Sequence, residues 1–187
     1  MPDSQAAAKA QEYLEVCRKK LDSAGGVIEC RIQNCPPGTG EPVFEKLDAN
    51  LAKAVMSIGS VKAVEIGDGT KAAYALGSQN NDGFCYGEDG RLAKTSNHAG
   101  GILGGISDGS QILLRAYIKP TPSIGQPQNT ADRNGQNISL EIKGRHDPVI
   151  VPRAVVVVES MAALVLTDAL LCGMSARMDH LKKIWNP

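Results

Sequence analysis

Apolar and polar positions divide the first third of the chain into alternating helices and strands. Apolar side chains recur at helical spacing over residues 4–23 and again over residues 43–58, and glycines follow both stretches. Residues 27–33 and 61–66 instead favour extended structure, because apolar side chains alternate with polar ones or are β-branched there. The pattern therefore predicts two helix–strand pairs.

The rest of the chain mixes strands with long polar loops. Residues 77–98 are polar and rich in turn formers, which predicts a surface excursion that either covers a site or is a variable loop without a role. Residues 111–118 and 138–142 favour strands, and the Pro-, Gly- and Asn-rich stretch 119–136 between them favours a loop that can hold a hairpin. Helices interleaved with such strands are typical of a layered α+β fold.

A long apolar run covers residues 152–172. Pro152 fits a first helical position and Gly173 fits a C-terminal cap, so the run predicts one helix. The helix is apolar around most of its circumference, which predicts burial between two layers of structure. Three charged residues interrupt it, Arg153, Glu159 and Asp168. Charges near a bilayer centre are costly, so a buried helix is favoured over a membrane span.

Composition limits the domain organisation and the binding partners that can be expected. A chain of 187 residues is typical of a single domain over 1–187, with 175–187 expected to form a mobile tail. Twenty Lys and Arg residues balance twenty Asp and Glu residues, and aromatic residues make up 4%, so neither nucleic acid nor a membrane is an expected partner. Five cysteines without a CxxC pair favour reduced thiols and no metal site.

Two loops are candidates for ligand contact. The glycine run 100–109 has the spacing of a phosphate-binding loop, but Ile106 stands where that motif needs lysine. It is therefore either a structural turn or a backbone surface that a ligand can approach closely. Residues 119–123 place a lysine before a proline-stiffened turn with two hydroxyls, which suits a phosphate or a ring edge and equally an ordinary turn.

A third candidate is the segment Gly144-Arg145-His146-Asp147-Pro148, which places a cation, an imidazole and a carboxylate side by side. Pro148 disfavours helical dihedrals at Asp147, so the segment is a loop before the long helix. The N-terminus of that helix adds partial positive charge, which suits an anion. An Arg two residues from an Asp can also be an exposed pair of little energetic weight. His146 is expected to pack or to hydrogen-bond structurally.

These segments together resemble a known family. The segment Arg145-His146-Asp147-Pro148, followed by Glu159-Ser160-Met161, is similar to the C-terminal signature of chorismate synthases. Four further stretches match family motifs in the right order: residues 40–44, 64–67, 96–107 and 119–123. The resemblance runs from about Met1 to about Cys172. It covers only the C-terminal half of the family, because the Gly-Glu-Ser-His-Gly and Arg-Ser-Ser-Ala-Arg motifs of the N-terminal half do not occur in the chain.

The resemblance implies a fold and a reaction. The fold is a sandwich of helices and antiparallel sheet that both halves of the family complete. The reaction is the 1,4-elimination of phosphate from 5-enolpyruvylshikimate 3-phosphate, which gives chorismate and needs reduced FMN. A cytoplasmic homo-oligomer and a complementary N-terminal half are further expectations. A non-catalytic flavin-binding module and an oligomerising remnant of the enzyme stay open as alternatives.

The resemblance also assigns residues to the flavin. Asp147 is the expected catalytic carboxylate, which relays the proton that the substrate loses. The expected flavin contacts are Gly59, Ser60, Gly104, Lys119, Pro120, Thr121, Pro122, Ser123 and Arg145. The chain departs from the family at Gly59-Ser60, where Asn-Ala is common, and at Pro122, where a small hydroxyl residue is common. At these positions the resemblance implies backbone contacts with the flavin and not the side-chain contacts of the family.

Overall fold

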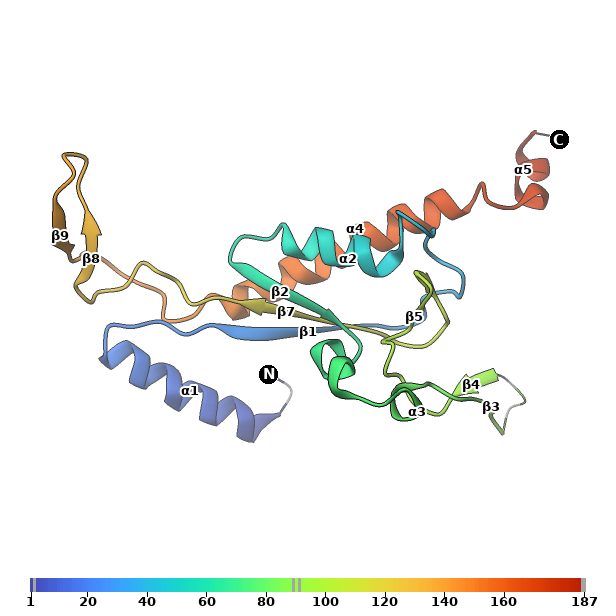
Figure 1. Cartoon of the computed structure of the whole chain (residues 1–187), viewed down its shortest axis with the longest axis horizontal. Helices are drawn as coiled ribbons and strands as arrows, with labels where there is room; N and C mark the ends of the chain where they lie inside the picture. The colour runs from blue at the N-terminus through green and yellow to red at the C-terminus, as the bar shows by residue number, and fades with distance from the viewer. Residues whose placement is uncertain (2, 89, 91, 186–187) are drawn as a thin grey trace.

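A computed structural model describes residues 1, 3–88, 90 and 92–185, and a three-stranded antiparallel sheet lies at its centre. Strand β7 (Ile112–Ile118) lies in the middle and pairs with β1 (Gly26–Ile32) on one side and β2 (Val61–Ile66) on the other (Figure 1). The pairing is regular along β1, and a register shift occurs at the start of β2. The predicted strands 27–33, 61–66 and 111–118 are confirmed.

Helices α2 (Leu47–Met56) and α4 (Val151–Gly173) cover one face of this sheet (Figure 1). Alternate residues of β7 point toward them, and Ile112, Leu114, Ala116 and Ile118 are buried. Leu51 of α2 is fully buried against this face, and burying such a side chain stabilises the fold by roughly 1.5–3 kcal/mol. Helices layered on an antiparallel sheet confirm the predicted α+β class.

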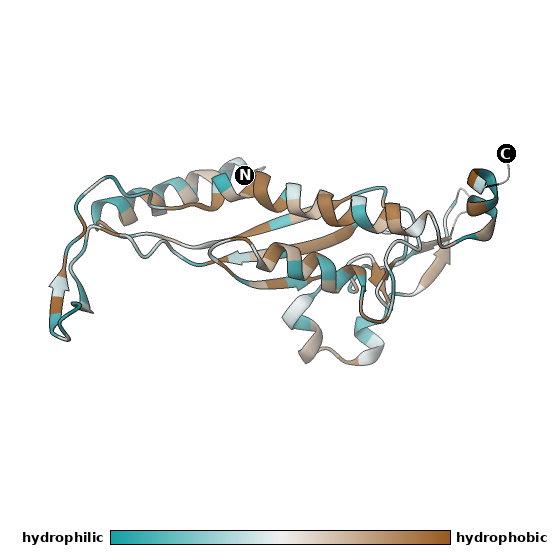
Figure 2. Cartoon of the chain, turned by 90° about the horizontal axis from the view of Figure 1, so that it is seen from above, coloured by the Kyte–Doolittle hydropathy of each residue, from teal (hydrophilic) through white to brown (hydrophobic). Residues whose placement is uncertain are grey.

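The prediction that the long apolar helix is buried between two layers is wrong for the described chain. One stripe of α4 packs on the sheet and α2, with members three or four positions apart: Val151, Ala154, Val158, Ala162, Val165 and Ala169. Large apolar side chains on the outer side are exposed: Val155, Val156, Val157, Leu164, Leu170 and Leu171. Hydrophobic residues recur along the whole helix (Figure 2). The apolar circumference is real, but the described residues supply only one covering layer.

By length and composition alone, α4 also meets the criteria for a membrane-spanning helix. Its inner stripe nevertheless contributes Val158, with no exposed surface, to the same core as the sheet residue Leu114. The helix is therefore built into the layered fold of the described chain.

The predicted strand 138–142 is confirmed over residues 138–140. Strand β9 (Asn137–Leu140) pairs with β8 (Gln128–Ala131) in a hairpin that is separate from the central sheet, so the hairpin expected in the 119–136 stretch is present. The hairpin projects away from the sheet (Figure 1). Its turn contains Asn134-Gly135, the kind of sequence that favours such hairpins. Alternation alone could not distinguish a strand of the core sheet from a strand of a projecting hairpin.

The remaining elements are short or peripheral. Helix α1 (Ser4–Lys19) begins where the Asp3 carboxylate accepts hydrogen bonds from two backbone N–H groups. The excursion 77–98, expected to be loop, contains α3 (Gly77–Asn80) and a hairpin of β3 (Phe84–Tyr86) and β4 (Leu92–Lys94). Three more elements are η1 (Gly69–Tyr74) and the short strands β5 (Ile102–Leu103) and β6 (Ile106–Ser107).

One helix boundary differs from the prediction. The second helix begins at Leu47, and Val43, assigned to its apolar stripe, lies in an exposed turn. Within the expected tail 175–187, residues Met178–Trp185 form the exposed helix α5, and residues 186–187 lie outside the described part.

Candidate functional site

One end of the central sheet gathers most of the predicted ligand-contacting segments. Lys119 follows β7 directly, and its backbone N–H donates to the carbonyl oxygen of Ser60 over 2.9 Å. Ser60 has a positive φ of 73°, which is uncommon for a residue other than glycine. The turn between α2 and β2 therefore lies against the start of the 119–123 turn.

His146 joins that turn to the loop that carries Asp147. Its Nε2 lies 2.9 Å from the carbonyl oxygen of Ile142, and its Nδ1 lies 3.2 Å from the Ser123 hydroxyl. A carbonyl can only accept, so Nε2 carries the hydrogen, and in the neutral ring Nδ1 accepts from Ser123. His146 thus has the structural hydrogen-bonding role expected from the sequence.

The segment between α1 and β1 also hydrogen-bonds to the 119–123 turn and to the loop of Asp147. The Ser23 hydroxyl donates to the carbonyl oxygen of Thr121 over 2.6 Å, and the Ala24 N–H donates to that of Pro148 over 2.8 Å. Gly25 is required here, because a Cβ atom at this position would lie 2.4 Å from the carbonyl oxygen of Ile118. Three separate parts of the sequence thereby meet at one end of the sheet.

Asp147 lies immediately before the N-terminus of α4. Its half-exposed carboxylate pairs with Arg153 from the first turn of that helix, and Arg145 is exposed. Exposed ion pairs of this kind contribute about 0–1 kcal/mol. The carboxylate can therefore leave Arg153 for a ligand at small cost.

Gly104 lies elsewhere. It occupies the β5–β6 turn, which precedes β7, whereas Lys119 follows β7, and a strand of this length spans about 20 Å. The neighbouring Gly105 accepts from the N–H of Leu47, at the start of α2. The glycine turn and the loop of Asp147 therefore lie at opposite ends of β7 in the described chain. A ligand that touches both must extend along the sheet.

The glycine at 104 is explained by its backbone conformation. Its φ is +61°, and a Cβ atom added there would meet nothing within 4 Å. The left-handed backbone, rather than lack of room, requires glycine. The backbone of this turn is consequently open to an approaching group.

A buried ion cluster lies beside the glycine run and was missed from the sequence. The Lys94 ammonium lies 3.0 Å from Asp82 and 2.7 Å from Asp108, and the three side chains are 4%, 3% and 8% exposed. Asp82 also accepts from the Ser96 hydroxyl and from the N–H groups of His98 and Ala99. We call Asp82, Lys94 and Asp108 the ionic clamp. Sequence separations of 12 and 14 residues gave no signal for it.

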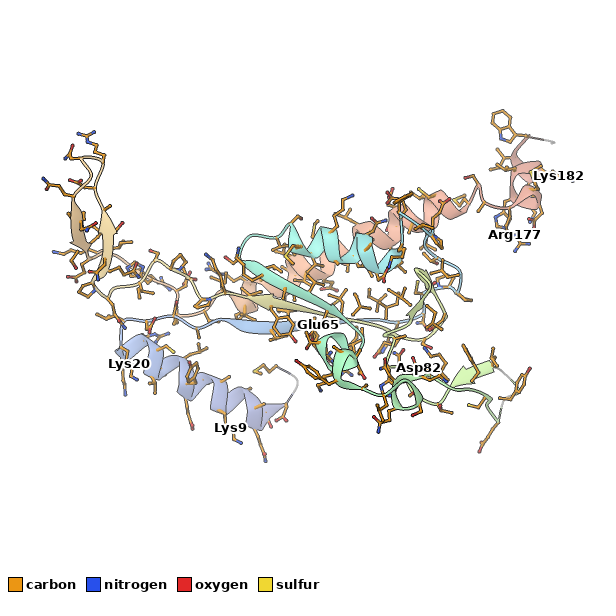
Figure 3. All side chains as sticks on the ribbon, in the orientation of Figure 1. Lys9, Lys20, Glu65, Asp82, Arg177 and Lys182 are labelled. Carbon is orange, nitrogen blue, oxygen red and sulfur yellow. The ribbon has the colours of Figure 1, made fainter. Side chains whose placement is uncertain are left out.

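The sheet face opposite α2 and α4 is polar. Tyr117 donates to Glu65 over 2.6 Å, and Arg115 donates to Glu29 over 3.0 Å and to the Gly67 carbonyl over 2.8 Å. Glu65, which Figure 3 labels, lies on β2 next to these groups. The hydrogen bond from Tyr117 lowers the pKa of Glu65. This face is therefore a charged surface rather than a second half of the core.

A broad cleft of about 1110 Å³ lies between the loop 36–42, α2 and the C-terminal part of α4. It contains none of the residues that the sequence assigned to the flavin. The cleft reflects the gap between the end of α4 and the 36–42 loop. The polar and charged residues predicted to contact a ligand lie instead at the end of the sheet near Lys119.

Comparison with known proteins decides the family. The family model described as chorismate synthase matches residues 1–171. The chain belongs to the chorismate synthase family. The chorismate synthase of Lachnoclostridium phytofermentans is 63% identical over 185 residues, which are 99% of this chain and 50% of that protein. That of Agathobacter rectalis is 61% identical over 97% of this chain and 49% of the relative.

A solved structure agrees with the family assignment. The crystal structure of a chorismate synthase superimposes with a TM-score of 0.76 and 34% identity, over 98% of this chain and 48% of that one. The chain thus spans about half the length of the chorismate synthases that it matches. Its fold is part of the fold of that family.

The 119–123 turn at this end of the sheet offers polar groups for ligand contact. The Thr121 hydroxyl oxygen is buried and has no hydrogen-bond partner within the described residues. Leaving such a group unpaired costs about 1–3 kcal/mol, so a ligand atom is the natural partner for it. Lys119 and Pro122 are exposed on the same turn, and the Ser123 hydroxyl is already engaged by His146.

The ionic clamp makes the stability of this chorismate synthase chain depend on pH. Burial alone would raise the pKa of Asp108, but the contact with Lys94 and the hydrogen bonds from Ser110 outweigh it, so the pKa is lowered. Burial is outweighed in the same way at Asp82, where hydrogen bonds chiefly from Ser96 and from the N–H groups of Ala99 and His98 lower the pKa. Carboxyls with lowered pKa stabilise the fold above their unfolded pKa of about 3.9, and this stabilisation is lost at lower pH.

We therefore predict that the free energy of unfolding decreases as the pH falls below about 4. Urea unfolding followed by circular dichroism at several pH values measures this. An Asp108→Asn variant should show a shallower decrease, because one of the two titrating carboxyls of the ionic clamp is gone. If the free energy of unfolding decreased equally steeply with falling pH in both proteins, the role given to the Asp108 carboxyl would be wrong.

Proposed function

We propose that this chain supplies the flavin-contacting and proton-accepting part of a chorismate synthase. The reaction is loss of phosphate from 5-enolpyruvylshikimate 3-phosphate, a carbon–oxygen lyase reaction that gives chorismate and depends on reduced FMN. One observation carries the proposal. The Ser60 turn, the 119–123 turn and the loop of Asp147 are hydrogen-bonded together at one end of the sheet, where the Thr121 hydroxyl lacks a partner among the described residues.

Each of these segments has a distinct part in holding the cofactor. Lys119 and Arg145 provide positive charge, and Thr121 provides a hydroxyl for the ligand. Gly59 and Ser60 provide backbone groups, and Pro120 and Pro122 fix the shape of their turn. When bound, reduced FMN supplies electron density to the substrate ring as phosphate departs. Gly104 belongs to the site if the ligand extends along the sheet, because it lies at the far end of β7.

Asp147 is the proposed proton acceptor. The elimination breaks one carbon–oxygen bond and one carbon–hydrogen bond, so a proton must leave the substrate ring. The Asp147 carboxylate takes up this proton, directly or through a bound group, when it is free of Arg153.

The exposed apolar outer face of α4 supports the proposal that further polypeptide packs against it. It exposes Val156, Leu164 and Leu171 by 60%, 64% and 61%, and contiguous apolar surface of this kind marks an interface. We propose that the other half of the chorismate synthase fold covers it, in the same polypeptide or in a separate one. The complete protein is then expected to assemble as a homo-oligomer. Five free cysteines fit a reducing compartment, so we place it in the cytoplasm.

The test is an assay of chorismate formation with reduced FMN. The chain is measured alone and mixed with the complementary half, defined as the part of the L. phytofermentans chorismate synthase that this chain does not match. We expect activity only in the mixture. Full activity of the chain alone would refute the need for a complement, and FMN binding without activity in the mixture would favour a non-catalytic flavin-binding module.

A further inference from the structure

The ionic clamp is tied to both ends of the glycine run. On one side, the Asp82 carboxylate accepts from the N–H groups of His98 and Ala99 over 2.7 and 3.0 Å, immediately before Gly100. On the other side, Asp108 follows the β5–β6 hairpin directly. The Lys94 ammonium contacts both carboxylates, so it links the two flanks of residues 100–107.

The run between these flanks has few means to fix its own shape. Gly100, Gly101, Gly104 and Gly105 all have positive φ, and glycine has more conformations to lose on folding than any other residue. The hairpin strands β5 and β6 contribute only two residue pairs. A rigid presentation of the Gly104 turn therefore depends on contacts from outside the run.

The clamp suits this task because it is almost completely buried. Figure 3 places Asp82 next to α3, on the side of the sheet opposite α4. Each carboxylate is also satisfied by neighbours: Asp82 by the Ser96 hydroxyl over 2.6 Å, and Asp108 by the Ser110 N–H over 2.8 Å. A buried charge pair with such support is rigid, and loss of one member leaves the others unpaired.

We propose that Lys94 is a positioning residue for the Gly104 turn, and that it sets the affinity for flavin without touching it. The proposal rests on the proposed function, with an FMN that extends along the sheet from the 119–123 turn to Gly104. Lys94 acts by holding Asp82 and Asp108 at a fixed separation, which fixes the path of residues 98–108. The excursion 77–98 then has a structural role as the carrier of Asp82 and Lys94.

The test compares three variants of the full chain, each mixed with the complementary half. The double variant Lys94→Met with Asp108→Asn removes the link without leaving two carboxylates face to face, and Asp82 keeps its hydrogen bonds from Ser96, His98 and Ala99. Lys94→Arg keeps the charge. Val158→Ala removes packing from the core under α4, so it lowers stability without changing the clamp.

Two quantities are measured under conditions where all proteins are folded: the Kd for FMN by titration, and hydrogen exchange of the amides of residues 98–108. We expect the double variant to bind FMN about 10- to 100-fold more weakly and to exchange faster in this segment. Lys94→Arg should recover most of the affinity. Val158→Ala should change neither quantity.

The outcomes separate this inference from the proposed function. If the unsubstituted pair binds FMN and the double variant binds it equally well, the positioning role is overturned and the proposed function stands. The positioning role is likewise overturned if Val158→Ala weakens FMN binding as much as the double variant does. If the unsubstituted pair binds no FMN, the proposed function is overturned and the inference with it.

Discussion

Replacing Asp147 by Asn is expected to lower the rate of chorismate formation by the chain and its complementary half by about 10²- to 10⁴-fold. The amide has nearly the shape of the carboxylate but cannot take up a proton. Asp147 is half exposed and contributes nothing to the buried core, so the variant should fold normally. The affinity for FMN should change little. Steady-state assays with reduced FMN, together with a flavin titration, measure both.

A matched control is available in Arg153, the ion-pair partner of Asp147. Arg153→Met breaks the same exposed pair but keeps the carboxylate, so its effect should stay within about fivefold, the range of an exposed ion pair. If Asp147→Asn and Arg153→Met lower the rate equally, Asp147 acts through its contact with Arg153 and not as a proton acceptor.

Replacing Leu164 by Glu is expected to abolish activity by preventing assembly. Leu164 lies on the outer face of α4 and is 64% exposed, so the fold of the chain alone should tolerate the substitution. In the assembled protein the carboxylate would be buried without a partner, which costs several kcal/mol and weakens association at least about 100-fold. Sedimentation velocity of the mixed halves measures association, and the chorismate assay measures its consequence.

Leu76→Glu is the control for that experiment. Leu76 is 66% exposed and lies just before α3, away from α4. It introduces the same charge at a similar exposure, so association and activity should remain. Association of the Leu164→Glu chain at the strength of the Leu76→Glu chain would show that the outer face of α4 is not the interface.

The sheet and its helices followed from the sequence because local patterns were reinforced by burial. In β7, every second side chain from Ile112 to Ile118 is buried, so a period of two was enough to identify the strand. Residues 137–140 show a similar alternation but belong to a projecting hairpin whose strands are exposed. Periodicity reports an extended conformation, and the partner of the strand depends on long-range contacts that the pattern does not contain.

In the candidate site, too, the segments could be predicted from the sequence but their arrangement in space could not. The resemblance identified the segments around Lys119 and Asp147, and the structure brings them together through Ser123 and His146. It did not reveal that Gly104 lies at the opposite end of β7, because the motifs record order along the chain and not distance. The clamp around Lys94 was invisible for another reason: its partners are ordinary aspartates that only the folded chain brings within 3.0 Å.

The proposed function depends above all on one arrangement, in which the end of the sheet near Lys119 holds the flavin with Asp147 beside it. A crystal structure of the chain bound to its complementary half and FMN tests this directly. We predict that the flavin ring lies against the 119–123 turn, that the Thr121 hydroxyl gains a hydrogen bond, and that the Asp147 carboxylate leaves Arg153 and faces the ligand. Flavin bound elsewhere, with Asp147 still paired to Arg153 and Thr121 still unpaired, would contradict this arrangement.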